Sequence, residues 1–177
     1  IKFYIENETD IVVTPHLYNV IDELSNIKGV PNMTISSSDG DANFFILILK
    51  KETYKEYIKE YVKKRNVKKN SVVDELEDIF YENILCTFII GVNNNEILDA
   101  YVVIPEYKSI EQLKICYIEE ISQALGLPYD VNIPYTNFND SVNLDYFTEC
   151  DRELLEILYN HRVKAGMTKD ELLPLVT

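Results

Sequence analysis

The chain has 177 residues, a net charge of -13 and 46% hydrophobic residues, a composition typical of a soluble globular protein. The negative charge argues against nucleic-acid binding, because a phosphate backbone needs Lys and Arg to replace its counterions. The one basic run, KKRNVKK at 63–69, fits the C-terminal end of a helix. No apolar run approaches the ~20 residues that span a bilayer, so no transmembrane segment is expected.

Strand and helix patterns alternate along the first half of the chain. A strand, a helix, a strand and two helices are predicted over residues 2–6, 14–29, 43–49, 51–65 and 71–83. Thr14 and Pro15 are typical of a helix start, and Gly29 is typical of a helix stop. The continuous apolar run NFFILIL at 43–49 predicts a strand that is buried on both faces.

The second half predicts a hairpin followed by three helices. These elements cover residues 85–104, 109–125, 148–159 and the segment from 168 onward. Asn93, Asn94 and Asn95 separate the two β-rich runs of the hairpin, and Gly126 ends the first of the helices. Capping-box pairs open the helices at Ser109 and Gln112, Thr148 and Asp151, and Thr168 and Glu171. The pattern predicts a single α/β or α+β domain over 1–177, with a small twisted mixed sheet packed on helices.

The helix at 109–125 contains polar residues that core packing does not explain. On a helical wheel its apolar stripe is formed by Ile110, Leu113, Tyr117, Ile121, Ala124 and Leu125. Cys116, Glu119, Glu120 and Gln123 lie together beside this stripe. Glu119 and Gln123 project to the same place because they are four residues apart, and Glu120 lies nearest the core.

The segment EEISQALGLPYD at 119–130 resembles the zinc-binding helix of metzincin peptidases. In that motif two His residues bind zinc, a Glu polarises the bound water, and a third His follows a Gly. Glu119, Gln123 and Tyr129 occupy the three His positions, whereas Glu120 and Gly126 match the Glu and the Gly. The resemblance implies a zincin-like fold with its metal ligands lost, and a former cleft at Glu119, Glu120, Gln123, Tyr129 and Asp130.

The segment 140–160 is similar to the metzincin stretch that runs from the Met-containing turn into a C-terminal helix, although Asn143 or Leu144 stands in the place of the Met. The strand-like segments ANFFIL at 42–47 and DAYVVI at 99–104, Cys116 just before the EEISQALGL segment, and the ending DRELLEILYNHRVKAGM at 151–167 form a second pattern. Through this pattern the chain resembles, over 42–167, an uncharacterised bacterial family of extracytoplasmic domains of unknown function. That resemblance implies a secreted or lipid-anchored protein. Because the chain starts at Ile1, directly before a strand-like segment, we expect that a leader or anchor has been removed.

Three kinds of chemistry are weighed at these residues. Zinc catalysis needs three good protein ligands, but His16 and His161 are the only histidines, so neither a metal nor another cofactor is expected. A metal-independent hydrolase would need a carboxyl facing Glu119 or Glu120 across the substrate, supplied by Asp130 or Asp140. Calcium would use alternate residues of the 137–145 loop, namely Asn137, Asn139, Ser141, Asn143 and Asp145. Asx turns are the preferred interpretation of that loop, because the EF-hand Gly and final acid are missing.

The three cysteines contain no CxxC pair, which argues against a cysteine zinc site. Cys86 and Cys116 form either a disulfide between a strand and the 109–125 helix or two buried thiols. The family resemblance and the expected secretion favour the disulfide, with Cys150 left free.

Without a metal, the Glu120 carboxylate must find hydrogen-bond donors or take up a proton. We expect it to bind backbone amides of the 128–147 loop, with Gln123 and Tyr129 in the same network. A row of tyrosines at 54, 57 and 61 is expected to cover part of a core. The sequence thus predicts an extracytoplasmic, metal-free pseudo-peptidase that binds a peptide or protein partner. The alternatives are a metal-independent hydrolase that uses Glu119 and Glu120, and a purely structural or interaction domain.

Overall fold

A computed structural model describes residues 1–8, 14–50, 53, 56–57, 60, 86–105, 109–139 and 141–176. The five-stranded sheet has the order β2-β1-β3-β5-β4. Its strands are β1 (Lys2–Asn7), β2 (Thr34–Ile35), β3 (Phe44–Leu49), β4 (Thr87–Asn93) and β5 (Glu96–Pro105). The helices are α1 (Thr14–Ser25), α4 (Ile110–Ala124), α5 (Glu149–Leu158) and α6 (Lys169–Val176), and a 3-10 turn covers Asp39–Asp41. The predicted mixed α/β fold is confirmed.

The apolar run at 43–49 becomes β3, the central strand of the sheet. It pairs in parallel with β1 on one side and with β5 on the other. Ile46, Leu47, Ile48 and Leu49 are all buried, although successive side chains point to opposite faces. The prediction of a strand buried on both faces is therefore confirmed.

The predicted hairpin is formed by β4 and β5, which pair in antiparallel fashion. Asn94 and Asn95 connect the strands and have φ values of 50° and 63°. Asn tolerates this left-handed region, and a two-residue turn of this kind matches the twist of the flanking strands. The pairing register shifts between Gly91 and Val92. At this irregularity Leu98 of β5 has no register partner on β4, because Gly91 pairs with Asp99 and Val92 pairs with Ile97.

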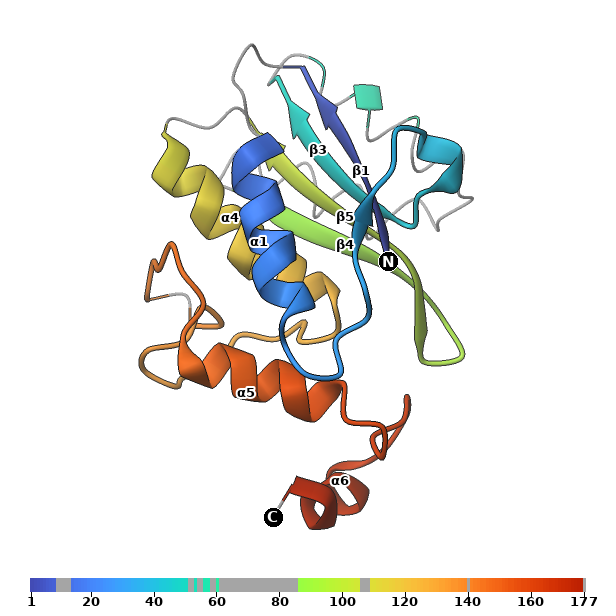
Figure 1. Cartoon of the computed structure of the whole chain (residues 1–177), viewed down its shortest axis with the longest axis vertical. Coiled ribbons are helices and arrows are strands. Elements are labelled where there is room, and N and C mark those ends of the chain that lie inside the picture. The colour runs from blue at the N-terminus through green and yellow to red at the C-terminus, as the bar shows by residue number, and fades with distance from the viewer. Residues whose placement is uncertain are drawn as a thin grey trace.

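Helices α1 and α4 lie side by side on one face of the sheet (Figure 1). Helix α1 ends at Ser25, four residues before the Gly29 predicted to stop it. Gly29 has a φ of 89°, and a Cβ there would lie 2.5 Å from the Tyr159 carbonyl oxygen. Only glycine permits both this backbone conformation and this close approach, so Gly29 brings the end of α1 against the end of α5.

Helix α5 and its C-terminal end contact both α1 and α4, the two helices that cover the sheet. Arg152 on α5 forms an ion pair with Glu23 on α1 at 2.7 Å. The Tyr159 hydroxyl donates a hydrogen bond of 2.8 Å to the carbonyl of Leu125 at the end of α4. The predicted capping box of Thr148 and Asp151 is confirmed. Within the described ranges, no helix combines the length and apolarity needed to cross a membrane.

The opposite face of the sheet carries an aromatic row. Phe45 stacks on Tyr101 with ring centroids 4.6 Å apart, and Tyr4 lies edge-on to Phe45. Thr53, Glu56, Tyr57 and Glu60 are helical, in agreement with the prediction over 51–65. The half-buried Tyr57 donates a hydrogen bond of 2.9 Å to Glu6, and burial together with this carboxylate raises the pKa of Tyr57. The predicted helix at 71–83, the basic run at 63–69, Tyr54 and Tyr61 lie outside the described residues.

Candidate functional site

Helix α4 positions the residues of the candidate site. The Ser109 side chain caps its start by accepting a hydrogen bond of 3.2 Å from the Gln112 backbone amide. The helix ends at Ala124, and Gly126 follows with a φ of 123°, so that the chain turns back as a glycine stop allows. The predicted apolar stripe is buried except for the half-buried Ile110. This stripe fixes which helix face carries the polar residues.

Glu120 is a buried carboxyl group with a raised pKa. Its side chain is 6% exposed, and none of the hydrogen bonds found among the described residues reaches its carboxylate. Burial raises the pKa of Glu120 well above its ordinary value, and the charges of Glu119 and Asp130 raise it further. The expected hydrogen bonds from amides of the 128–147 loop to Glu120 are not found in the described part of that loop. Burial and the two neighbouring carboxylates therefore favour the protonated form of Glu120 over the ionised form.

Gln123, rather than Glu120, connects the helix to the following loop. Its side-chain nitrogen donates a hydrogen bond of 2.8 Å to an Asp130 carboxylate oxygen. Gln123 is buried, Asp130 is exposed and Glu119 is half-buried. Tyr129 is 82% exposed, so its side chain lies outside this contact. The structure thus brings together Glu119, Glu120, Gln123 and Asp130, but not Tyr129.

The metzincin resemblance raises the question of whether these residues fit a zinc ion. Zinc in a catalytic site needs three protein ligands that converge on one point. The Gln123 amide is a poor ligand, and it already donates to Asp130. Tyr129, at the third ligand position, points into solvent. Within the described ranges, no group of three or more His, Cys, Asp or Glu is placed to hold a metal ion. The donor set therefore does not fit zinc.

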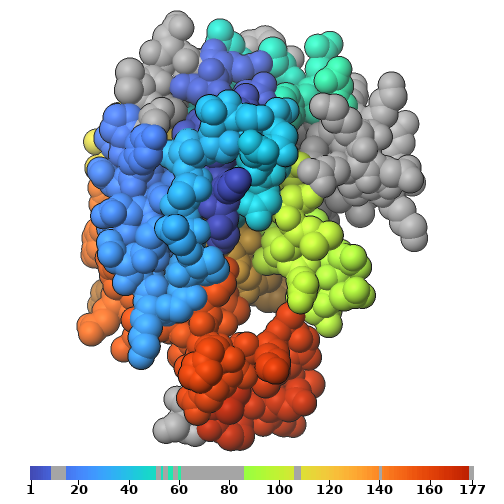
Figure 2. Space-filling view, turned by 45° about the vertical axis from the view of Figure 1, so that its right-hand side comes forward, coloured from blue at the N-terminus to red at the C-terminus, as the bar shows by residue number. Residues whose placement is uncertain are grey.

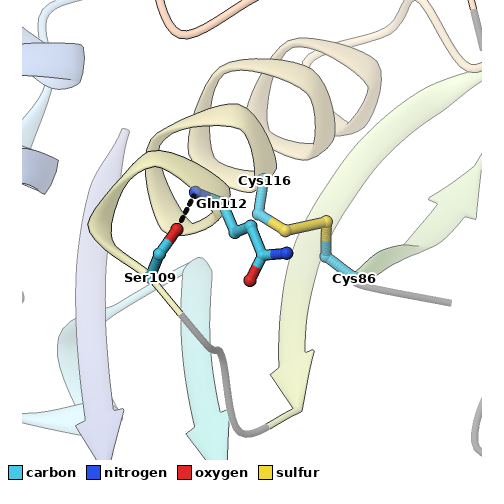
Figure 3. The surroundings of a disulfide bond; sticks show 4 residues. All are labelled: Cys86, Ser109, Gln112 and Cys116. Atoms are coloured by element: carbon cyan, nitrogen blue, oxygen red, sulfur yellow. Dashed lines mark hydrogen bonds between the residues drawn. A yellow bond between two sulfur atoms is a disulfide. The ribbon is translucent and has the colours of Figure 1, made fainter. Parts of the chain in front are cut away.

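A disulfide joins Cys86, directly before β4, to Cys116 on α4 (Figure 3). Both cysteines are buried, and Cys150 is the free cysteine. The predicted disulfide is confirmed, and the alternative of two buried thiols is wrong. Cys116 lies one helical turn before Glu120, on the same side of α4. The bond therefore fixes the start of β4 against the helix that carries the candidate site.

The loop that follows α4 is anchored by Asp151, which is fully buried on α5. Its carboxylate accepts hydrogen bonds from the Thr136 hydroxyl at 2.5 Å, from the Asn137 backbone amide at 3.0 Å and from the Asn137 side chain at 2.7 Å. It also accepts the Thr148 backbone amide at 2.8 Å. The sequence identified Asp151 only as a helix cap, because no local pattern indicates its contacts with residues fifteen positions earlier.

The Asx-turn interpretation of the 137–145 loop is confirmed. The Asn139 side-chain oxygen accepts hydrogen bonds from the Ser141 backbone amide at 3.0 Å and from the Ser141 hydroxyl at 2.6 Å. The Asn139 side-chain nitrogen donates to the Ile133 carbonyl. These bonds engage the Asn139 and Ser141 side chains, two of the five ligands that the calcium interpretation named. Asp140, the other carboxyl considered for a hydrolase, lies outside the described residues.

Replacing Glu120 with Gln is expected to remove a pH-dependent loss of stability. The pKa of Glu120 is higher in the folded chain than in the unfolded chain. Its contribution to the free energy of unfolding is therefore fully present below the pKa of the unfolded state, and it is lost as the pH rises toward the pKa of the folded state. In that window the free energy of unfolding should fall by up to about 1.4 kcal/mol per pH unit. Urea unfolding of both proteins across this range measures the effect, with the exposed Glu156→Gln as control. Equal pH slopes in Glu120→Gln and wild type would refute the assignment.

Comparison with known proteins gives a family without a known activity. A family model described as "Protein of unknown function (DUF2927)" matches residues 1–177. Searches of curated proteins and of solved structures found no match.

Proposed function

The chain belongs to this family of unknown function, and we propose that residues 1–177 form one non-catalytic, metal-free domain that binds a peptide. We place it as a relative of the metzincin peptidases that has lost hydrolysis. The environment of Glu120 and the hydrogen bond of Gln123, both on α4, support this proposal. A zinc peptidase needs an ionised Glu beside a metal-bound water, whereas Glu120 is buried with a raised pKa and Gln123 donates to Asp130. Glu119, Glu120, Gln123, Tyr129 and Asp130 then border a binding cleft instead of a catalytic one.

Strand β4 is the proposed docking edge for the peptide. It is the last strand of the sheet order, and within the described residues no further strand pairs with its outer edge. Its sequence, TFIIGVN, contains no charge and no Pro, although natural edge strands are commonly protected by such residues. An extended peptide gains backbone hydrogen bonds by adding to an edge of this kind. The Cys86–Cys116 disulfide keeps that edge in place beside α4.

We also propose that the domain works outside the cytoplasm, whether secreted or lipid-anchored. The buried Cys86–Cys116 disulfide supports this location, because such bonds persist in oxidising compartments and are rare in the cytosol. A metal-independent hydrolase is the second candidate function. It is favoured by the raised pKa of Glu120 beside Glu119 and Asp130, since a carboxyl group that stays protonated can act as a general acid.

Strand addition to β4 predicts an alternating pattern of backbone contacts in the bound peptide. A peptide selected from a random displayed library is synthesised with one N-methyl amide at each position in turn. Methylation of every second amide should weaken binding about tenfold, because it removes a backbone hydrogen bond and adds a clash. The intervening amides face away from the sheet and should tolerate the change. Fluorescence anisotropy measures the dissociation constants. Uniform tolerance, or uniform loss, would contradict docking at a strand edge.

A further inference from the structure

A cavity of about 220 Å³ opens between the end of the sheet and the ends of α4 and α5. Figure 2 shows the surface hollowed between the N-terminal strand, the β4–β5 hairpin and the C-terminal segment. The side chains that define it come from the starts of β3 and β5 and from the end of α4, including Phe44, Ile97, Leu98, Ala124 and Leu125. None of its lining residues belongs to β4. The cavity is therefore separate from the strand edge proposed above.

The size and walls of the cavity suit a single apolar side chain. Sites for drug-sized ligands usually enclose about 300–1,000 Å³, so a cavity of 220 Å³ is too small for such a molecule. Ile97 and Leu98 are both exposed at its border, and Leu98 reaches 55% exposure. A border of exposed aliphatic side chains around an apolar hollow is typical of a surface that another chain covers.

The charges near the cavity favour a positively charged partner. Asp99 belongs to the lining, and the exposed Glu96 precedes Ile97. The exposed Asp41 lies two residues before the lining residue Asn43. The basic groups here are Lys2 and the Ile1 amino group, which donates a hydrogen bond of 2.8 Å to the Asn32 carbonyl. With a net charge of -13 over the whole chain, the field around this opening attracts cations and repels anions of the same shape.

Tyr159, which also lines the cavity, adds no charge to it at neutral pH. It donates its hydrogen to the Leu125 carbonyl at 2.8 Å, and burial raises the pKa of Tyr159 to about 12. The hydroxyl is therefore neutral and polar, and its oxygen has acceptor capacity left for a donor on the partner.

We propose that this cavity receives the apolar anchor side chain of a basic peptide segment. The inference goes beyond peptide addition to β4, because it concerns different residues and a side chain rather than a backbone. The apolar walls hold an aliphatic or aromatic side chain the size of Leu, and flanking Lys or Arg residues meet the acidic surroundings. Both features are needed, since charge alone gives only weak, salt-dependent attraction.

Three acetylated and amidated pentapeptides test the proposal at one salt concentration: KKLKK, KKAKK and EELEE. The methyl NMR signals of Ala100 and Ala124, which are buried in the lining, report occupancy. KKLKK should shift both signals and bind about tenfold more tightly than KKAKK, because burying Leu removes more apolar surface from water than burying Ala. EELEE should leave the signals unchanged. Equal affinity for KKLKK and KKAKK, or binding of EELEE, would overturn the proposal.

Two charge-matched variants locate the binding. Leu98→Lys puts a cation at the border of the cavity, whereas Tyr18→Lys makes the same charge change at a residue of α1 with nearly equal exposure, 54% against 55%. Leu98→Lys should abolish the preference for KKLKK, and Tyr18→Lys should retain it. Equal behaviour of the two variants would contradict docking in the cavity. Failure of strand addition at β4 would not alter these results, so the two proposals fail separately.

Discussion

Replacing Asp151 with Ala is expected to lower the free energy of unfolding by about 4 kcal/mol, among the largest effects of a single substitution. The carboxylate accepts hydrogen bonds from Thr136, from two groups of Asn137 and from the Thr148 backbone amide. Thr136 and Asn137 are buried, so the donors that lose Asp151 cannot turn to bulk water. Each such donor costs about 1–3 kcal/mol when it is left unsatisfied.

Asp145→Ala is the matched control for this experiment. Asp145 is an exposed carboxylate whose ion pair with Lys114 measures 3.7 Å, and exposed pairs contribute about 0–1 kcal/mol. Urea unfolding followed by circular dichroism gives both values. If Asp151→Ala lost no more stability than Asp145→Ala, the buried network would not be what anchors the loop after α4 to α5.

Replacing Cys86 and Cys116 together with Ala is expected to destabilise the domain by about 3.6 kcal/mol, on the loop-entropy model of disulfide stabilisation. The cysteines are 30 residues apart in the sequence, so the bond closes a loop of moderate length in the unfolded chain. The lost constraint also frees the start of β4 from α4. Peptide binding at the β4 edge should weaken in the double variant, since the edge is no longer held in place.

Cys150→Ala is the control for the double variant, because Cys150 is a free cysteine on α5. It should change stability by much less than the double variant. Thiol titration under denaturing, non-reducing conditions checks the bonding state independently, and should find one free thiol in the wild type. Three free thiols would refute the disulfide, as would equal stability of the double variant and wild type.

Most of the elements could be predicted because their signals are local. The apolar run of β3, the Asn turn of the hairpin and the glycine stop of α4 each depend on a few neighbouring residues. Strand β2 was missed because it has only two residues, Thr34 and Ile35, and its pairing with β1 depends on the whole connection through α1. The strand order was not predictable for the same reason, since parallel pairing joins segments far apart in the sequence.

Only the part of the candidate site that lies on the helix could be predicted from the sequence. The four-residue spacing of Glu119 and Gln123 placed their side chains together, and the wheel placed Glu120 at the core edge. The hydrogen bond between Gln123 and Asp130 crosses the turn at Gly126, whose direction the sequence does not give. The exposure of Tyr129 depends on that same turn. Contacts across a loop are set by tertiary packing, and the motif alone could not supply them.

The buried Glu120 connects the stability of the domain to its proposed function. A carboxyl group without donors is unfavourable when ionised in a buried position, so a purely structural helix would do better with an apolar residue there. Glu120 nevertheless stands there, and the charges of Glu119 and Asp130 raise its pKa further. In our proposal it is a residue of the former catalytic centre that the fold tolerates by keeping it protonated.

In the proposed function, α4 borders a peptide-binding site that neither holds zinc nor cleaves peptides. The most direct test incubates the selected peptide with wild type and with Glu120→Gln, each with added zinc or with a chelator. Mass spectrometry follows the integrity of the peptide, and anisotropy follows its affinity. We expect an intact peptide under all four conditions, and for each protein the same dissociation constant with zinc and with the chelator. Cleavage by the wild type that is lost in Glu120→Gln, or binding that the chelator abolishes, would contradict it.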